Sequence, residues 1–303
     1  MRKGLSGLLL AAAGLIGLIA VAAAAIFLSL PDVRKLQGCL TTELYHVHLC
    51  KTDPGYVAFE NISPHIIDAI IMSEDASFYS HQGVDLVEMK ESFKKDWDEK
   101  RFARGASTIT QQMVKNVFLS SNKSLLRKVE EVYLALQVEK VFTKKQILTF
   151  YLNVVEFGPD IYGVKGAAKY YFNKTPAEVT PEQAAFLAFL LPNPKKYMQS
   201  FKKGQLTPFA ARTVNTILHR MLKSNRLTEE EFLAASGRVG SHLWHGEPPP
   251  SETSTNDGPS KEQKDTAVDT DLMESPTGIV EPPPDESNQE NDDFQFEFNS
   301  DNN

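Results

Sequence analysis

Two adjacent acidic residues, Glu74 and Asp75, are the first candidates for acid–base chemistry, because they follow an apolar segment that predicts a helix. A carboxylate at the carboxyl end of a helix lies beside the negative end of the helix dipole, and the nearby rings of Phe78 and Tyr79 would remove it from water. Both effects raise the pKa of a carboxyl group, which suits a general base or acid that works near neutral pH. The alternative is a solvated acidic turn with no catalytic role, since Asp and Glu are usually exposed.

A second candidate is an anion site in residues 105–116, which read GASTITQQMVKN and predict a glycine turn leading into a helix capped by Ser107. Free backbone N–H groups and the hydroxyls of Ser107 and Thr108 would face one spot, a geometry that binds anions. Gln112 and Lys115 are three residues apart and share one face of the helix. The alternative is an ordinary capped helix, because the segment lacks the lysine of a phosphate-binding loop. The opposite, buried stripe is predicted to hold Ile109, Met113 and Val117.

A second candidate carboxylate is Glu131, in a segment over residues 127–140 that predicts another helix. At 100° per residue, Arg127 and Glu131 fall on the same side of this helix as Leu134 and Val138. Two interpretations stay open, a purely structural ion pair between Arg127 and Glu131 and one wall of a cleft. The opposite side is predicted to be a stripe of Leu125, Val129, Val132, Tyr133 and Leu136.

Helix signals recur from about residue 60 to residue 245 and strand alternation is scarce, so a mainly α fold is predicted. Helix starts are indicated by Ser63 before a proline, by Thr143 with Gln146, and by the sequence TPEQ at residues 180–183. The last of these opens a segment that is apolar all round and therefore belongs in the core. A final amphipathic helix over residues 209–222 is predicted to bury Ala210, Val214, Ile217, Leu218 and Met221.

The amino terminus predicts a membrane anchor over residues 1–30. Residues 5–30 carry no charge and follow Arg2 and Lys3. As a helix they would be about 39 Å long, against a bilayer core of roughly 30 Å. A cleaved signal peptide usually has a shorter apolar core, so an uncleaved anchor with a cytoplasmic amino terminus is favoured.

The charge of the remaining chain is divided unevenly. Residues 247–303 hold 16 acidic and two basic residues, a net charge of −14, with eight prolines, and this composition predicts a disordered tail. Residues 1–246 hold 30 basic and 23 acidic residues, a net charge of +7, which favours an anionic ligand or a membrane surface. The folded domain is therefore expected over residues 31–246. Within it, Cys39 and Cys50 form either a disulfide or two buried thiols, and their spacing matches no usual zinc pattern.

At these residues the sequence resembles the peptidoglycan glycosyltransferases, glycosyltransferase family 51. Five segments carry the resemblance in order over residues 60–197, and no transpeptidase domain follows, which is typical of the monofunctional biosynthetic branch. The segments are Glu74–Asp75 with Phe78, His81, Gly83 and Asp85; residues 105–116; Arg127–Lys128 with Glu131; residues 146–172 with Asn153, Gly158 and Gly163; and residues 184–194.

The resemblance implies a lysozyme-like helical domain that polymerises lipid II with inversion at C1 and release of undecaprenyl diphosphate. Glu74 would be the base that takes the proton of the acceptor hydroxyl, and Glu131 the second catalytic carboxylate. No cofactor is required, although divalent Mg or Mn is an expected aid at the diphosphate. The residues expected to bind the substrate are Asp75, Ser107, Thr108, Gln111, Gln112, Lys115, Lys123, Arg127 and Lys128.

The resemblance also implies a place and partners for the chain. It would be a single-pass protein of the bacterial inner membrane, with its catalytic domain in the periplasm. Its partners would be lipid II, the growing glycan strand and proteins of cell-wall synthesis or division, and not nucleic acid. Lys123 stands where the family commonly has arginine, and lysine lacks the two-pronged geometry that suits phosphate. Two alternative functions stay open, a lysozyme-like glycan hydrolase and a non-catalytic scaffold of the wall-synthesis machinery.

Overall fold

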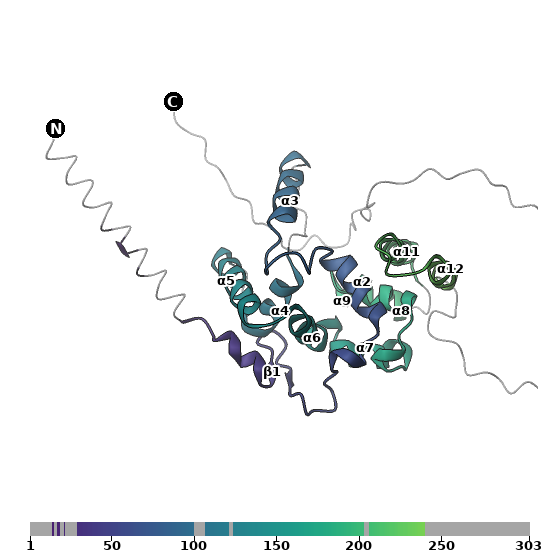
Figure 1. Ribbon diagram of the computed structural model, residues 1–303, viewed down its shortest axis with the longest axis horizontal. Helices are drawn as coiled ribbons and strands as arrows, with labels where there is room; N and C mark the ends of the chain where they lie inside the picture. The colour runs from purple at the N-terminus through teal and green to yellow at the C-terminus, as the bar shows by residue number, and fades with distance from the viewer. Residues whose placement is uncertain are drawn as a thin grey trace, which may run out of the picture. The chain divides into compact units, whose positions relative to one another are not determined.

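The computed structural model describes residues 29–99, 107–120, 124–202 and 206–239, with positions 14, 17, 18 and 21 besides (Figure 1). The chain divides into two units, Met1–Ser251 and Glu252–Asn303, and the second contains no described residue. The predicted anchor lies almost wholly outside the described residues, and the predicted tail lies wholly outside them. Within the described part, no helix has the length and apolar character needed to cross a membrane.

The prediction of a mainly α fold is confirmed, since helices make up most of the described chain and the only strands described there form two short hairpins. The elements run in the order η1 (Val33–Gln37), β1 (Leu40–Thr41), β2 (His48–Leu49), η2 (Phe59–Asn61), α2 (Pro64–Glu74), α3 (Leu86–Glu99), α4 (Ile109–Phe118), α5 (Leu125–Val141), α6 (Lys144–Val154), β3 (Glu156–Gly158), β4 (Ile161–Tyr162), α7 (Gly163–Phe172), η3 (Pro176–Glu178), α8 (Pro181–Leu190), α9 (Pro194–Tyr197), α10 (Gln199–Lys202), α11 (Pro208–Lys223) and α12 (Glu229–Arg238).

Three helices begin at the caps that the sequence predicts. Ser63 caps α2 by accepting the backbone N–H of His65, and Pro64 takes the first helical position, where no N–H donor is needed. Thr143 and Thr180 open α6 and α8 with capping boxes. The five apolar residues predicted for the buried face of α11 are all buried, which confirms that face.

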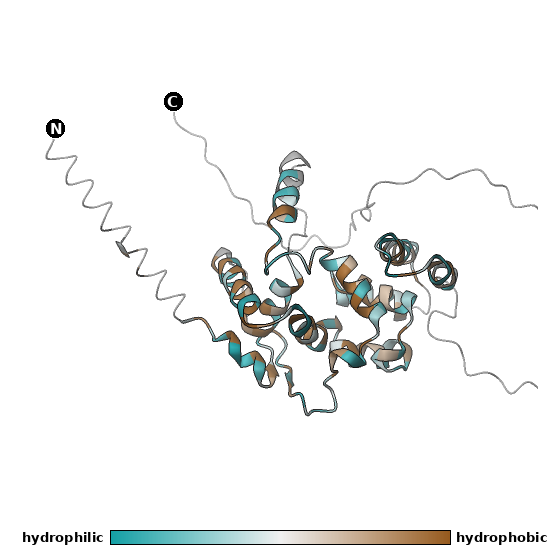
Figure 2. Cartoon of the chain, viewed as in Figure 1, coloured by the Kyte–Doolittle hydropathy of each residue, from teal (hydrophilic) through white to brown (hydrophobic). Residues whose placement is uncertain are grey.

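The core is centred on α8, every residue of which is buried. This helix packs against α2 and α11, while α4 packs against α5 and α6. In Figure 2, α2 and α5 each carry hydrophobic and hydrophilic stretches, as helices that cover a core do. The two packed groups meet where the carboxyl end of α2 contacts α4, through hydrogen bonds from α4 to the candidate carboxylates Glu74 and Asp75.

The two apolar stripes predicted for α5 suggest a helix covered on two faces, and only one of them is well buried. Leu134 and Val138 are buried, whereas in the other stripe Val129 is 52% exposed and Leu136 is 38% exposed. The elements that pack on α5 are α4, α6 and η1, so one of its two apolar faces remains at the surface.

Cys39 and Cys50 form a disulfide across the hairpin of β1 and β2, which resolves the alternative that the sequence left open. The loop of this hairpin is tied to the end of α4, because Glu43 and Leu44 donate backbone hydrogen bonds to carbonyls of that helix. Among the described residues, the one set of three ligand-type side chains close enough to share a metal ion is Cys39, His48 and Cys50. Both sulfurs are already bonded to each other and offer no thiolate to a metal.

Gly163 begins α7 in a backbone conformation that requires glycine. Its φ is +69°, and a Cβ atom there would lie 2.5 Å from the carbonyl oxygen of Asn153. Any other residue would therefore push β4 away from α6.

One buried ion pair fastens α12 to the core helix. Glu182 is buried on α8, and the guanidinium group of Arg238 donates to both of its oxygens, at 2.8 and 2.9 Å. Replacing Arg238 with alanine leaves a buried carboxylate without its cation, and we expect the free energy of unfolding to fall by about 2 kcal/mol. Urea unfolding measures this change. Arg212, an exposed arginine on α11, supplies the control, and an equal loss in Arg212→Ala would contradict the assignment.

Candidate active site

Glu74 is the last residue of α2 and is half-buried. Burial raises its pKa, as predicted, although a hydrogen bond from Gln112 and the charge of Lys115 oppose that rise. The Gln112 amide nitrogen lies 2.8 Å from the Glu74 Oε2 atom. A carboxylate with a raised pKa and a donor aimed at its charged form has the properties of a general base.

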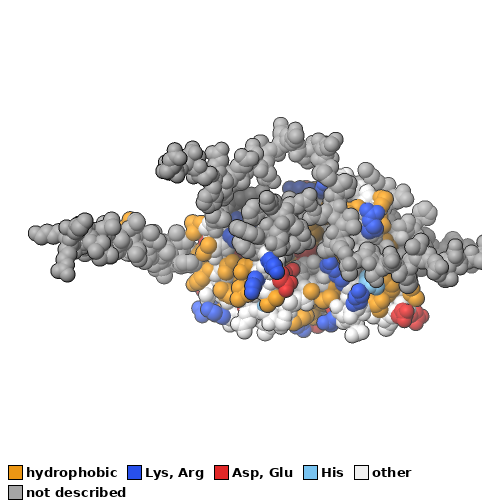
Figure 3. All heavy atoms as spheres, turned by 90° about the horizontal axis from the view of Figure 1, so that it is seen from above, with side chains coloured by type: hydrophobic (Ala, Val, Ile, Leu, Met, Phe, Trp, Pro, Cys, Tyr) orange, Lys and Arg blue, Asp and Glu red, His pale blue; other side chains and the backbone are white. Residues whose placement is uncertain are grey.

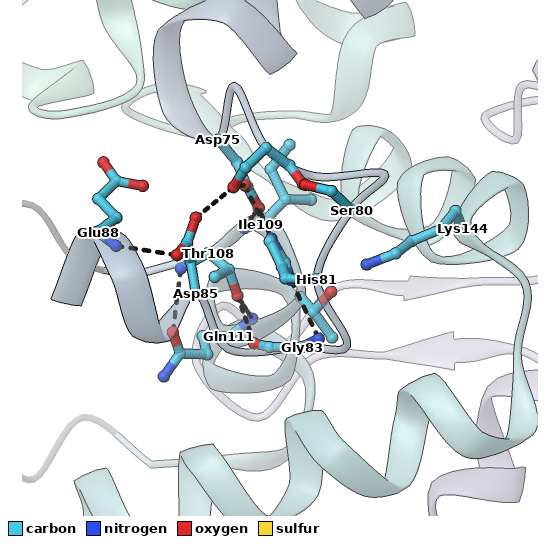
Figure 4. A network of polar contacts seen from close by, with 12 residues as sticks. Asp75, Ser80, His81, Gly83, Asp85, Glu88, Thr108, Ile109, Gln111 and Lys144 are labelled. Atoms are coloured by element: carbon cyan, nitrogen blue, oxygen red, sulfur yellow. Dashed lines mark hydrogen bonds and ion pairs between the residues drawn. The ribbon is translucent and has the colours of Figure 1, made fainter. Parts of the chain in front are cut away.

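Asp75, beside it, is buried and holds the start of α4 in place (Figure 4). It accepts the backbone N–H of Ile109 at 2.9 Å, and the Nε2 atom of His81 lies 2.9 and 3.1 Å from its two oxygens. Sequence reasoning expected Asp75 to bind substrate, whereas its carboxylate contacts groups of the protein itself.

The cap of α4 is Thr108, and not Ser107 as predicted. Thr108 accepts the backbone N–H of Gln111, and the Gln111 side chain accepts the backbone N–H of Thr108. Because this reciprocal pair and Asp75 occupy N–H groups at the helix start, the predicted anion site there is largely filled by the protein. The Thr108 hydroxyl also donates to the carbonyl oxygen of Gly83, at 2.6 Å (Figure 4).

Gln112 and Lys115 share a face of α4, as predicted. Gln112 donates a hydrogen bond to Glu74, and Lys115 interacts electrostatically with Glu74 and Glu131. Burial lowers the pKa of Lys115, whereas the charges of Glu131 and Glu74 raise it. Lys115 therefore lies within electrostatic reach of both candidate carboxylates. The opposite stripe of α4, comprising Ile109, Met113 and Val117, is buried.

Glu131 is buried, and its cation is Lys128 rather than Arg127. The Lys128 Nζ atom lies 2.5 Å from the Glu131 Oε1 atom and 2.9 Å from the hydroxyl oxygen of Ser107. Of the two interpretations left open for Glu131, the structural ion pair with Arg127 is not the one observed, because Lys128, three residues away, is the cation in contact with Glu131. Lys128 thus joins α5 to the segment that precedes α4.

Arg127 occupies the neighbouring surface. It lines a pocket with Leu30, Phe118 and Glu130, and its buried Nε atom has no hydrogen-bond partner among the described residues. It also lies close enough to Lys115 to lower the pKa of that lysine. On the face drawn in Figure 3, basic and acidic side chains lie next to one another among hydrophobic ones. Lys123, the remaining predicted phosphate ligand, lies outside the described residues.

Sequence reasoning missed the part played by Tyr151. Its ring is fully buried on α6, and its hydroxyl donates to the Gln112 amide oxygen at 2.9 Å. The usable signal was the tyrosine itself, since a buried tyrosine hydroxyl normally has a hydrogen-bond partner.

One half-buried and one buried carboxylate, with a lysine on which the charges of both act, form a site that can carry out acid–base chemistry. The profile of the family described as Transglycosylase matches residues 43–222. The chain belongs to this family, which confirms the resemblance seen in the five segments.

Several biosynthetic peptidoglycan transglycosylases are similar to this chain. It is 38% identical to that of Nitrosospira multiformis over 170 residues, which are 56% of this chain and 72% of the relative. It is 44% identical to that of Dechloromonas aromatica over 142 residues, 47% of this chain and 62% of the relative. It is 43% identical to that of Brucella suis over 166 residues, 55% of this chain and 73% of the relative.

Proposed function

We propose that this chain is a peptidoglycan glycosyltransferase that polymerises lipid II into glycan strands, on a lysozyme-like domain over residues 31–246. Membership of the transglycosylase family and the names of the relatives support this activity. The observation that carries the proposal is the position of Lys115, which interacts with both Glu74 and Glu131. A site of this kind can accept a proton on one side and bind a departing diphosphate on the other.

Glu74 acts as the base. It takes the proton of the 4-hydroxyl of the acceptor N-acetylglucosamine, whose oxygen forms a bond with C1 of the donor sugar. The bond from C1 to the diphosphate oxygen breaks with inversion, and its electron pair leaves with undecaprenyl diphosphate. The raised pKa of Glu74 makes it a stronger base than an exposed carboxylate.

The cations stabilise the departing diphosphate. Lys115 and Lys128 are the described lysines that interact with Glu131, and Arg127 lies beside them. Glu131 holds Lys128 in position and assists departure as the second carboxylate of the pair. Positive charge placed where negative charge develops is among the largest contributions to catalysis.

The proposed reaction requires no cofactor, although a divalent Mg or Mn ion would aid it at the diphosphate. The carboxylates of the site form no group of three metal ligands among the described residues, so they supply no cage for Mg or Mn. A Mg ion commonly takes one or two carboxylates together with substrate phosphates. Glu131 is the residue near the cations that would contribute such a ligand, and the ion would supply charge neutralisation to the diphosphate.

A glycan hydrolase is the main alternative, because paired carboxylates across a sugar bond also serve hydrolysis. A hydrolase uses water as the acceptor and has no need for cations around a diphosphate. Incubating the purified chain with lipid II and, separately, with preformed glycan distinguishes the two. Long polymer from lipid II supports the transferase, shortened strands support the hydrolase, and no change in either supports a non-catalytic scaffold.

The site requires a membrane-bound substrate, and the sequence offers an anchor. We propose that residues 5–30 span the bacterial inner membrane once and place the domain in the periplasm beside its lipid-linked donor. We also propose that the acidic residues 247–303, whose composition predicts a disordered tail, contact proteins of cell-wall synthesis or division. The growing glycan strand is the second substrate.

Replacing Lys123 with arginine tests the proposed phosphate contact at that position. Arginine keeps the positive charge and adds a planar pair of donors that fits phosphate, so polymerisation should equal or exceed that of the parent. Initial rates at low concentrations of lipid II measure the difference. A large loss of rate would contradict a role for Lys123 as a phosphate ligand.

A further inference from the structure

The Tyr151 hydroxyl, the Gln112 amide and the Glu74 carboxylate form a directional chain of hydrogen bonds from the core outward. The hydroxyl of Tyr151, on a ring with no exposed surface, donates to the Gln112 amide oxygen at 2.9 Å. The amide nitrogen of Gln112 in turn lies 2.8 Å from the Glu74 Oε2 atom. The chain joins α6, α4 and α2, which are the three helices that meet at the site.

The chemistry of each group restricts the orientation of the amide. An ionised carboxylate only accepts hydrogen bonds, so it requires the NH2 group of Gln112 on its side. In the reversed orientation the amide oxygen would face Glu74, which suits only the protonated acid. The Tyr151 hydroxyl decides between the two. A tyrosine hydroxyl can also accept from an NH2 group, but among the described residues the Gln112 amide oxygen is the acceptor for its own O–H, and reversal of the amide would leave that buried donor unsatisfied.

We propose that Tyr151 is a positioning residue, whose hydroxyl fixes the orientation of the Gln112 amide and thereby favours the ionised form of Glu74. The inference rests on the proposed role of Glu74 as the base. Tyr151 touches neither Glu74 nor the reacting atoms in this arrangement, and it acts through Gln112.

Several other groups around Glu74 also change its pKa. Lys115 of α4 stabilises the ionised form, Asp75 at the end of α2 destabilises it, and Ser73 donates a hydrogen bond. Burial outweighs these groups and raises the pKa of Glu74, while Tyr45 and Asp75 also act on Tyr151. A hydrogen-bond donor that stabilises the ionised carboxylate therefore opposes burial, which is the largest cause of the raised pKa of Glu74.

Replacing Tyr151 with phenylalanine removes the donor and keeps the ring. A base works only when deprotonated, so activity falls as the pH drops through its pKa. Loss of the donor raises that pKa, and the acid limb of the kcat/KM profile should move up by roughly 0.5 to 1 pH unit. The same shift should appear in the infrared titration of the Glu74 carboxyl band, identified by its absence in Glu74→Gln.

Tyr171→Phe is the matched control. Tyr171 is also a buried tyrosine, and its hydroxyl donates to the carbonyl oxygen of Phe157 at 2.7 Å, in another part of the core. Both variants lose one buried hydrogen bond and should lose similar stability. Only Tyr151→Phe should move the pH profile.

A second substitution tests whether Tyr151 acts through Gln112. Gln112→Met removes the amide at similar length, and it should raise the titration midpoint of Glu74 at least as much as Tyr151→Phe. Adding Tyr151→Phe to that variant should then cause no further shift. If Tyr151→Phe fails to fold, Gln112→Met alone still tests the donor to Glu74, because its midpoint should rise in any case.

Two outcomes would overturn the inference, an unchanged midpoint in folded Tyr151→Phe or an undiminished effect of this change in the Gln112→Met background. The infrared titration needs no turnover, so it separates this inference from the proposed function. A shifted midpoint in a chain that makes no polymer would overturn the function and support the positioning effect.

Discussion

Replacing Glu74 with glutamine is expected to abolish polymerisation of lipid II and leave the fold intact. Glutamine has the shape of glutamate but cannot accept the proton of the acceptor hydroxyl. Loss of a positioned general base typically costs about 100- to 10,000-fold in rate. Polymer formation from lipid II measures the loss, and thermal unfolding checks the fold.

Glu60→Gln is the control for this experiment. Glu60 is an exposed glutamate whose partner is Lys145, away from the candidate carboxylates. Its replacement should leave the rate of polymerisation unchanged. Unchanged turnover in Glu74→Gln would remove Glu74 from the role of the base and would favour a scaffold.

Replacing Lys115 with methionine is expected to have the second largest effect. Methionine preserves length and apolar contact but removes the charge that interacts with Glu74 and Glu131. Removing one preorganised group that stabilises developing charge costs about 100- to 1,000-fold in kcat. Steady-state kinetics with lipid II should show this loss together with a raised KM.

The same substitution should change the pH dependence of any remaining activity. Lys115 lowers the pKa of Glu74, so its removal raises that pKa and moves the acid limb of the profile to higher pH. Lys145→Met, on an exposed side chain, is the control and should alter neither rate nor profile. A normal rate in Lys115→Met would show that the diphosphate is bound elsewhere.

The local signals of the sequence predicted the helices well. Ser63, Thr143 and Thr180 each satisfy free N–H groups at a helix start through residues nearby in the chain. The raised pKa of Glu74 was predicted from its place at the end of a helix and from the nearby rings of Phe78 and Tyr79, and burial is the largest cause of the rise. These features depend on neighbours that the sequence places side by side.

The errors concern contacts between distant segments. The choice of Thr108 over Ser107 as the cap is accompanied by a bond from Thr108 to Gly83, 25 residues away. The choice of Lys128 over Arg127 as the partner of Glu131 accompanies a contact between Lys128 and Ser107, 21 residues away. Helical spacing alone allows either partner, so only the packing of α4 against α5 decides.

Tyr151 and Gln112 are 39 residues apart in the sequence, so local sequence patterns could not predict the contact between them. The sequence gives no indication of the direction in which the hydroxyl of the buried Tyr151 points. The sequence also could not predict which face of α5 is exposed, because two apolar stripes give no indication of which one the neighbouring helices cover.

The central claim is that Glu74, Glu131 and Lys115 act on one lipid-linked donor and one sugar acceptor. A structure of the full chain with a non-reactive lipid II analogue tests it most directly. We predict the acceptor 4-hydroxyl within about 3 Å of Glu74 and the diphosphate against Lys115. An analogue bound away from Glu74, with its diphosphate out of reach of Lys115, would contradict the claim.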